Sequence, residues 1–339
     1  MNKLKIEKET KIYVACPANF ASGGPELLHQ LVYELTNLGF SAYMYYYGRI
    51  NNTSPVHEAY LSYKNLFVDK IIDNDKNILI VPETNTKLLY DYSSVQKVIW
   101  WLSVDNYLAF LNSKSVLKRI IKKCLYKTKL YPRNIYRFNN NEPVIHFVQS
   151  EYAKQWIKSK GIENAFFLSD YINKLFIEKQ TKNVNNKKDI VIYNPKKGLE
   201  FTKMIIAEAK EIKFVPIENM KRDEVAYLFS TAKVYIDFGN HPGKDRMPRE
   251  AAISGCCVIT SKNGSAKFYE DVPIPNEFKF DAKVRNIPSI VEKIRNCFNN
   301  YETEIVKFEN YREMIKNEQA KFIDDIKNIF RLSNEIHSQ

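Results

Sequence analysis

Residues 234–260 read VYIDFGNHPGKDRMPREAAISGCCVIT, and this stretch contains a strand, a polar loop, a helix and a second strand. The apolar run 234–238 predicts the first strand, and 247–254 predicts a helix that ends at Gly255. The apolar run 256–260 predicts the strand that follows. Two short apolar strands joined through a helix are typical of neighbouring strands in a parallel sheet.

The same alternation of short apolar runs and helical patterns extends over most of the chain. Further strands are expected at 11–17, 42–46, 77–82, 97–104, 144–149, 189–193, 212–217 and 278–280, and further helices at 25–38, 113–130, 197–210, 222–231 and 287–298. This pattern predicts the α/β class, with parallel sheets in two domains at 1–175 and 190–315 and a polar linker at 176–189. Residues 316–339 form a predicted C-terminal helix that could pack back on the first domain.

The composition is that of a folded protein, with 45% hydrophobic and 27% charged residues among 339. No run of eighteen apolar residues exists, and the charged first ten residues lack the apolar core of a signal peptide. We therefore expect a cytoplasmic protein. The cysteines show no spacing typical of a metal site or a disulfide framework. We expect all of them to be reduced core residues: Cys16, Cys124, Cys256, Cys257 and Cys297.

Glycine is scarce, and the ten that occur are expected at positions where no side chain fits. Three of them follow predicted helices, as C-capping glycines do: Gly39, Gly161 and Gly255. Four others stand at corners between a strand and a helix, and such corners line the ligand crevice of open α/β sheets: Gly23, Gly24, Gly198 and Gly243. A tight turn without a ligand is the alternative for any one of them.

Residues 250–252 (EAA) and 255–259 (GCCVI) resemble the donor-site signature of the retaining family 4 glycosyltransferases. The resemblance implies the GT-B fold, in which two Rossmann-like domains with parallel sheets face each other across a cleft. It also implies that Glu250 holds the ribose hydroxyls of a nucleotide. A carboxylate suits that role because it can accept hydrogen bonds from both hydroxyls of a diol.

Other segments resemble the same family in the expected order. Residues 193–198 (YNPKKG) resemble its corner of a basic residue and a glycine, which meets the donor diphosphate. Residues 21–26 (ASGGPE) resemble its glycine pair, while 146–153 and 167–173 resemble the last strand of the first domain and the turn before the crossing. The donor-binding residues implied by these matches are Glu250, Met247, Gly243, His241, Asn194, Gly198, Gly23 and Gly24.

One position departs from the family pattern. A second glutamate usually stands eight residues before the one that Glu250 matches, and this chain has Pro242 there. Proline cannot contact the donor sugar or the diphosphate region as that glutamate does. The resemblance implies a retaining enzyme, but the donor sugar and the stereochemical outcome stay open.

Sugar transfer from a nucleotide diphosphate leaves negative charge on the diphosphate, so cations and helix N-termini would assist it. We expect Arg246 and Lys197 in this catalytic role, with a solvated surface charge as the alternative for each. Asp105 follows a predicted strand and could orient an acceptor hydroxyl, but a helix N-cap is equally consistent with its place. The resemblance implies no essential metal and no cofactor beyond the nucleotide-sugar.

A basic segment accounts for much of the net charge of +12, because residues 106–141 hold nine lysines and arginines and no acid. Its apolar residues repeat at helical spacing, and the opposite face is positive: Lys118, Arg119, Lys122 and Lys123. Such a helix favours an anionic membrane surface, and the alternative is a core helix with a solvated face. A neighbouring aromatic cluster could contact acceptor sugars, with half of it expected in the core: Trp100, Trp101, Tyr107 and Phe110.

These observations predict transfer of a hexose-type sugar from a nucleotide diphosphate to a glycan or a lipid-linked glycan acceptor, in surface polysaccharide synthesis. The enzyme would act in the cytoplasm or at the inner face of the cell membrane. A sugar-nucleotide epimerase of the same fold is a second interpretation, and a non-catalytic basic binding protein is a third. Nucleic acid is not expected as a partner, because no binding motif occurs and the charge gathers on one helix.

Overall fold

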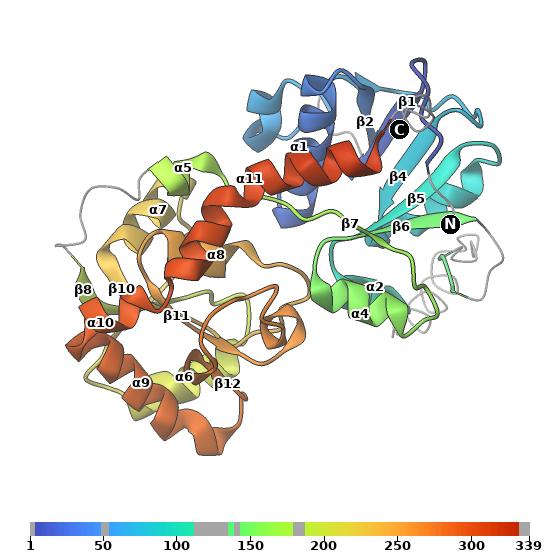
Figure 1. The fold of residues 1–339 in the computed structure, drawn as a ribbon. Helices are drawn as coiled ribbons and strands as arrows, with labels where there is room; N and C mark the ends of the chain where they lie inside the picture. Colours follow the sequence, from blue (N-terminus) through green and yellow to red (C-terminus); the bar gives the residue numbers. More distant parts are fainter. Residues whose placement is uncertain (1–3, 49–53, 112–134, 139–142, 179–186, 332–339) are drawn as a thin grey trace, which may run out of the picture. The chain divides into compact units, whose positions relative to one another are not determined.

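The computed structural model describes residues 4–48, 54–111, 135–138, 143–178 and 187–331 (Figure 1). The chain divides into two compact units. Unit 1 comprises residues 1–149, 153–168 and 323–339, and unit 2 comprises residues 150–152 and 169–322. The main crossing therefore falls between residues 168 and 169, while the predicted boundary is at 175.

In the described residues of unit 1, seven strands form one sheet. The strands are β1 (Lys11–Pro17), β2 (Ser41–Tyr47), β3 (Phe67–Val68), β4 (Ile78–Pro82), β5 (Gln96–Trp101), β6 (Val144–Val148) and β7 (Phe166–Phe167). Their order is β3-β2-β1-β4-β5-β6-β7, and every pair is parallel. This is the doubly wound arrangement of Rossmann-like folds, with the order reversing between β1 and β4.

The helical elements described for unit 1 join these strands. They are α1 (Gly23–Asn37), η1 (Glu58–Tyr63), η2 (Glu83–Asp91), α2 (Val104–Leu111) and α4 (Glu151–Lys158), of which α4 begins in unit 2. Helix α1 forms because its apolar residues recur at helical spacing and face the sheet; the buried ones are Leu27, Leu28, Leu31, Val32 and Leu35. The predicted helix at 113–130 lies outside the described residues.

The aromatic residues after β4 belong to the core of unit 1. Trp100 and Trp101 are completely buried, and Tyr107 is 1% exposed. The indole N–H of Trp100 donates to the carbonyl oxygen of Leu168 at 3.0 Å. The expectation that the aromatic cluster contacts acceptor sugars is wrong for these three side chains, because almost none of their surface is exposed.

Unit 2 contains a second parallel sheet, to which its described residues contribute five strands. The strands are β8 (Lys188–Tyr193), β9 (Lys213–Pro216), β10 (Ala232–Asp237), β11 (Cys257–Ser261) and β12 (Lys279–Phe280). Their order is β12-β11-β10-β8-β9, so the order reverses between β8 and β10. This is the other common doubly wound arrangement.

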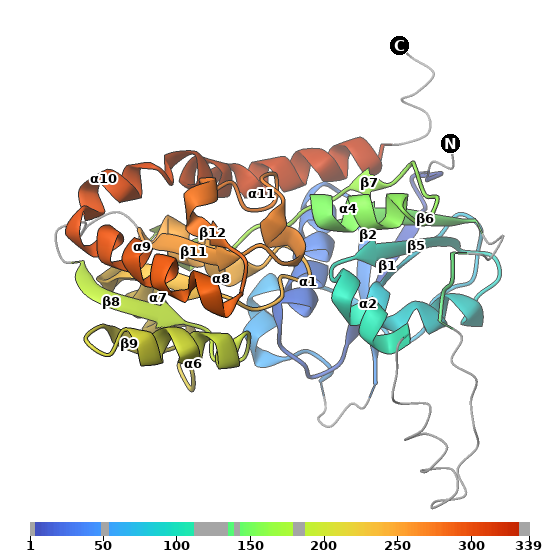
Figure 2. The same ribbon diagram turned by 90° about the horizontal axis from the view of Figure 1, so that it is seen from below.

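The helices of unit 2 follow the strands in alternation. They are α5 (Lys174–Glu178), α6 (Leu199–Glu208), α7 (Arg222–Thr231), α8 (Arg246–Ile253), α9 (Ile287–Asn299), α10 (Tyr301–Val306) and α11 (Glu309–Ile329). Short 3-10 turns lie at η5 (Gly264–Lys267), η6 (Asn276–Phe278) and η7 (Val284–Asn286). Helices α6 and α9 lie side by side (Figure 2), and α9 also contacts β10.

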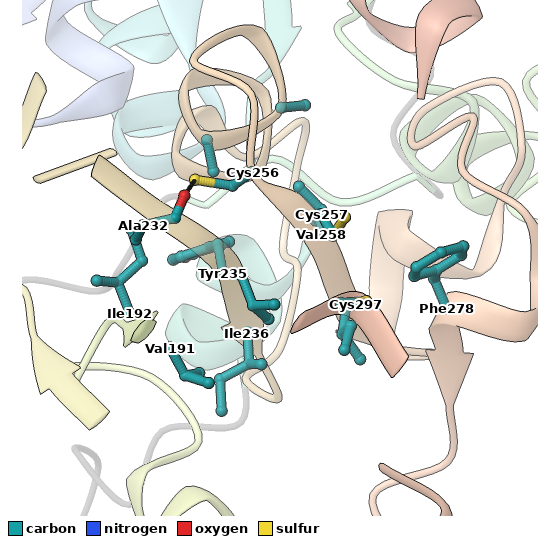
Figure 3. Packing of buried hydrophobic residues seen from close by; sticks show 14 of the residues in the cluster. Val191, Ile192, Ala232, Tyr235, Ile236, Cys256, Cys257, Val258, Phe278 and Cys297 are labelled. Carbon is teal, nitrogen blue, oxygen red and sulfur yellow. Dashed lines mark hydrogen bonds between the residues drawn. The ribbon is translucent and has the colours of Figure 1, made fainter. Parts of the chain in front are cut away.

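The core of unit 2 contains three of the cysteines (Figure 3). Cys256 lies just before β11, with its sulfur 3.3 Å from the carbonyl oxygen of Ala232. Cys257 and Cys297 are also completely buried. The described cysteines carry free thiols, and burial raises the pKa of Cys256 and Cys16. The expectation of reduced core residues is confirmed for these four, while Cys124 lies outside the described residues.

The last helix, α11, contributes residues to both units. Phe322 packs against Tyr171 in unit 2, and Phe330, just beyond the helix, packs against Phe40 and Phe147 in unit 1. In the part of the chain that the structure describes, no helix is long and apolar enough to cross a membrane.

Candidate functional site

Three loops meet at the carboxyl edge of the sheet in unit 2. Residues 194–198 follow β8, residues 238–245 follow β10, and residues 262–265 follow β11. Strands β8 and β10 are the neighbours between which the strand order reverses. In doubly wound sheets, ligands bind outside the carboxyl ends of the strands at this reversal. The topology therefore makes these loops the candidate site.

Three glycines allow the loops to approach each other closely. A β-carbon on Gly198, whose φ is +60°, would lie 2.5 Å from the backbone of Phe238. One on Gly239 would lie 2.5 Å from the β-carbon of Lys197, and one on Gly264 would lie 2.0 Å from the carbonyl oxygen of His241. Any side chain at these positions would force the loops apart. The prediction that no side chain fits is confirmed for Gly198, Gly239 and Gly264.

Gly239 and Gly264 were not predicted as site residues, although Gly239 directly follows a predicted strand and Gly264 lies shortly after another. Gly23 and Gly24, which were predicted as site residues, form the first turn of α1 in unit 1. A β-carbon on Gly23 would meet nothing within 4 Å, and one on Gly24 would lie 3.8 Å from a Leu102 methyl group. The expectation that no side chain fits there is wrong, because both positions have room.

Lys197 connects the first two loops through an ion pair. Its ammonium nitrogen lies 2.8 Å from both carboxylate oxygens of Asp245, the residue that precedes α8. Asp245 Oδ2 also lies 3.0 Å from Nδ1 of His241. The imidazole is completely buried, and its Nε2 lies 3.4 Å from the carbonyl oxygen of Asp237. The prediction that the His241 side chain contacts the donor is therefore wrong for this conformation, because the ring has no exposed surface.

The charges of this cluster shift each other's protonation. Burial lowers the pKa of His241, but the contact with Asp245 and the negative charge of Asp237 outweigh burial, so the pKa is raised. Burial raises the pKa of Asp245, but His241 and the Lys197 ammonium outweigh it, so that pKa is lowered. Both shifts favour the charged forms of His241 and Asp245.

The same cluster offers donor atoms that could hold a metal ion. One ligand atom each from Asp237, His241 and Asp245 lies within 4.8 Å of the others, the one such group among the described residues. These atoms already have protein partners: Asp237 accepts hydrogen bonds from Gly239 N–H and the Tyr235 hydroxyl, both at 3.0 Å. The Asp245 carboxylate is likewise in contact with Lys197 and His241. The expectation of no essential metal stays a prediction.

A second, more deeply buried network surrounds the first turns of α8. The guanidinium of Arg249 is completely buried and lies 2.8 Å from Asp170 and 2.9 Å from Glu318. Lys244 lies 2.9 Å from Glu318, and Arg246 lies 3.8 Å from Asp170. The two carboxylates come from the segment before α5 and from α11, so the network fixes the start of α8 from two sides.

The remaining predicted donor residues of unit 2 lie on the same loops or on α8. Glu250 and Met247 are half-buried residues of α8. Asn194 accepts a hydrogen bond from the Lys196 N–H at 3.0 Å, which shapes the turn after β8. The carbonyl oxygen of Gly243 accepts a hydrogen bond from the Ser265 hydroxyl at 2.6 Å. The donor-binding residues predicted in unit 2 therefore lie on the loops at one edge of the sheet or on α8.

Asp105 lies in unit 1, in the first turn of α2, and is not part of this edge. The alternative role as a helix cap is wrong for it, because the Ser103 hydroxyl accepts the Asn106 N–H at 3.1 Å instead. Glu83, which the sequence patterns do not single out, is a buried residue just after β4, and its carboxylate accepts a hydrogen bond from the Leu102 N–H at 3.0 Å. The predicted membrane-facing residues lie outside the described residues: Lys118, Arg119, Lys122 and Lys123.

Comparison with known proteins finds relatives in structure only. No protein-family model and no curated protein matches the sequence. A sucrose-phosphate synthase from Thermosynechococcus elongatus has a TM-score of 0.67 at 12% identity, and the match covers 98% of this chain and 100% of the synthase chain. A glycosyltransferase from Rickettsia africae has a TM-score of 0.64 at 15% identity, and the match covers 96% of this chain and 99% of that chain. This protein has a GT-B glycosyltransferase fold. HepE from Anabaena, solved with UDP-glucose, agrees, with a TM-score of 0.60 at 9% identity over 98% of this chain and 100% of its own.

At identities this low the GT-B likeness establishes the fold alone. It confirms the predicted α/β class with two parallel sheets, one in each unit. Membership of family 4 stays a prediction, because no family model supports it.

Proposed function

We propose that this GT-B protein is a glycosyltransferase that takes its sugar from a UDP-sugar. The observation that carries the proposal is the ion pair at the strand reversal of unit 2 between Lys197, just before α6, and Asp245, just before α8, with Arg246 in the first turn of α8. Solved structures of HepE from Anabaena, which shares the fold, contain UDP or UDP-glucose. That likeness supports UDP as the nucleotide of the donor.

Sugar transfer requires stabilisation of the diphosphate, which gains negative charge as the sugar leaves. In the proposed mechanism, Lys197 and Arg246 supply cations, and the amide N–H groups that begin α6 and α8 supply oriented donors. Loss of one such contact typically costs about 2–4 kcal/mol in the transition state. Glu250 is half-buried, and its carboxylate would accept hydrogen bonds from the ribose hydroxyls. Met247 on the same helix would lie beside the nucleotide.

Nucleotide binding can be measured by thermal shift with UDP-glucose, and with GDP-, dTDP- and CMP-sugars for comparison. A ligand at one hundred times its Kd stabilises the native state by about 2.7 kcal/mol. We expect the largest shift with the UDP-sugar and its loss in Glu250→Ala. Lys203→Met is the matched control, because Lys203 is an exposed residue of α6 paired with Glu200 at 3.0 Å. A protein that none of these ligands stabilises would contradict the proposal.

The finer assignments belong to the same proposal. The acceptor would be a glycan or a lipid-linked glycan in surface polysaccharide synthesis, and the basic segment would bring the enzyme to an anionic membrane surface. Asp105 would orient the acceptor hydroxyl. Transfer would retain the anomeric configuration and need no metal. Product analysis by NMR tests the stereochemistry, and full activity in EDTA tests the metal; activity that returns only with Mn²⁺ would contradict the latter.

A further inference from the structure

We propose that Asp245 is a positioning residue, which holds the Lys197 ammonium in place for the donor diphosphate and is itself held by His241. This inference rests on the proposed function and adds two residues to it. Neither residue would touch the reacting atoms. Both would act through Lys197.

The orientation of the Asp245 carboxylate is the first observation in favour. Asp245 stands at the N-cap of α8, with φ −63° and ψ 141°, where an aspartate usually accepts a backbone N–H of the first helical turn. Its side chain makes no such capping bond. Both oxygens instead lie 2.8 Å from the Lys197 nitrogen. The carboxylate therefore binds the Lys197 ammonium and does not cap the helix that it precedes.

Lys197 is fixed at both ends of its side chain. At the backbone, the loops pack closely at Gly198 and Gly239, because a β-carbon on either would lie 2.5 Å from the facing loop. At the other end, Asp245 binds the ammonium through two contacts. An ammonium has three N–H donors, and the Lys197 side chain is 32% exposed, so it can still donate to a phosphate oxygen. Fixing a flexible lysine beforehand removes an entropic cost from binding.

His241 gives Asp245 a rigid support. Its Nδ1 lies 3.0 Å from Asp245 Oδ2, and the ring is completely buried. The backbone at His241 is fixed too, because its carbonyl oxygen accepts the Ser265 N–H at 2.8 Å. Gly264 packs against the same carbonyl so closely that no side chain fits. The loop after β11 therefore holds His241, His241 holds Asp245, and Asp245 holds Lys197.

A double-mutant cycle separates positioning from a merely structural ion pair. The variants are Lys197→Met, Asp245→Asn and the double variant, and the readout is the Kd for UDP by calorimetry. We expect each single variant to weaken UDP binding about tenfold or more. Because Asp245 acts through Lys197, the double variant should bind UDP no more weakly than Lys197→Met. The control is Asp189→Asn, which breaks a 2.6 Å pair with Lys233 at the opposite end of β8 and should bind as the wild type.

The outcomes distinguish the two proposals. If the wild type binds no UDP or UDP-sugar, the proposed function and this inference both fail. If the wild type binds UDP but Asp245→Asn binds it equally well, or if the two effects multiply in the double variant, only the positioning role fails. Should Asp245→Asn not fold, His241→Gln takes its place in the cycle. That variant should weaken UDP binding in the wild-type background and have no effect in the Lys197→Met background.

Discussion

Replacing Arg249 by methionine removes the central cation of the buried network at α8. Methionine keeps much of the length of the arginine side chain but carries no charge. Asp170 and Glu318 would then lose partners at 2.8 Å and 2.9 Å. Lys244 stays 2.9 Å from Glu318, and Arg246 stays 3.8 Å from Asp170. Asp170 is completely buried, so its charge would be poorly compensated.

Removing one partner of a buried ion pair typically costs about 3–5 kcal/mol, because the other charge stays buried without it. A domain of this size loses about 2–4 °C of melting temperature per kcal/mol. We therefore expect Arg249→Met to lower the melting temperature of unit 2 by about 6–20 °C. Asp170→Asn added to this variant should restore part of the loss, because it removes the uncompensated charge.

The pH dependence supplies a second signature. In the wild type, burial raises the pKa of Asp170, but the charges of Arg249, Lys244 and Arg246 outweigh burial and lower it. A carboxylate with a lowered pKa contributes stability above its unfolded pKa and loses it as the pH falls. Without Arg249, burial would dominate and raise the Asp170 pKa above its unfolded value. The variant should then regain stability as the pH falls, so its deficit should be smaller at pH 5 than at pH 8.

Urea unfolding of both proteins at pH 5 and pH 8 measures this deficit directly. Arg295→Met is the control: Arg295 pairs with Glu211, and both side chains are more than half exposed, so less than about 1 kcal/mol should be lost. A deficit below about 1 kcal/mol for Arg249→Met at pH 8 would refute the assignment of a buried, mutually dependent network. An equal deficit at both pH values would refute the role given to Asp170.

Three further changes test the packing of each unit. Lys187→Met should cost unit 2 about 2–4 kcal/mol by urea unfolding, because the ammonium donates to three main-chain carbonyls at the ends of α7 and α8 at 2.7–3.0 Å. Gly264→Ala should lower the melting temperature far more than Gly39→Ala: both have positive φ, but only the first would place a β-carbon 2.0 Å from another loop, and equal losses would refute this. Burial raises the pKa of Glu83 to about 7, so wild-type stability should fall as the pH rises from 5 to 7. Glu83→Gln should weaken that fall, and an unchanged profile would show that Glu83 is not its source.

The sheets could be predicted from the sequence where strands are long and apolar. The run KIYVACP predicts 11–17, and β1 has these bounds. The two-residue strands β3 and β7 were missed, because each pairs with a single neighbour through two residues and the apolar runs 66–68 and 165–168 are short. Helix boundaries agreed to within a residue or two where a glycine marks the end, as at Gly255, whose φ is +82°.

The site could be predicted only in part, because local patterns do not encode which loops meet. The corner at Lys197 and Gly198 follows from a strand that ends just before a helix. Its partner Asp245 lies 48 residues further along the chain. Arg249 and Asp170 are separated by 79 residues. The first pair depends on how the loops after β8 and β10 stack, and the second on how the segment before α5 packs against α8. No period in the sequence specifies either.

The burial of the cations decides which of them could serve a diphosphate. The sequence around α8 is rich in basic residues, but Arg249 is completely buried and Lys244 is 9% exposed, with both bound to buried carboxylates. Such cations cannot leave their partners without exposing an uncompensated charge. Arg246 and Lys197 are 13% and 32% exposed and lie at the edge of the sheet. The positive charge available to a ligand is therefore smaller than the sequence implies. Neutralising Lys197 or Arg246 should weaken UDP binding more than it weakens the fold. Neutralising Arg249 should weaken the fold more than it weakens UDP binding.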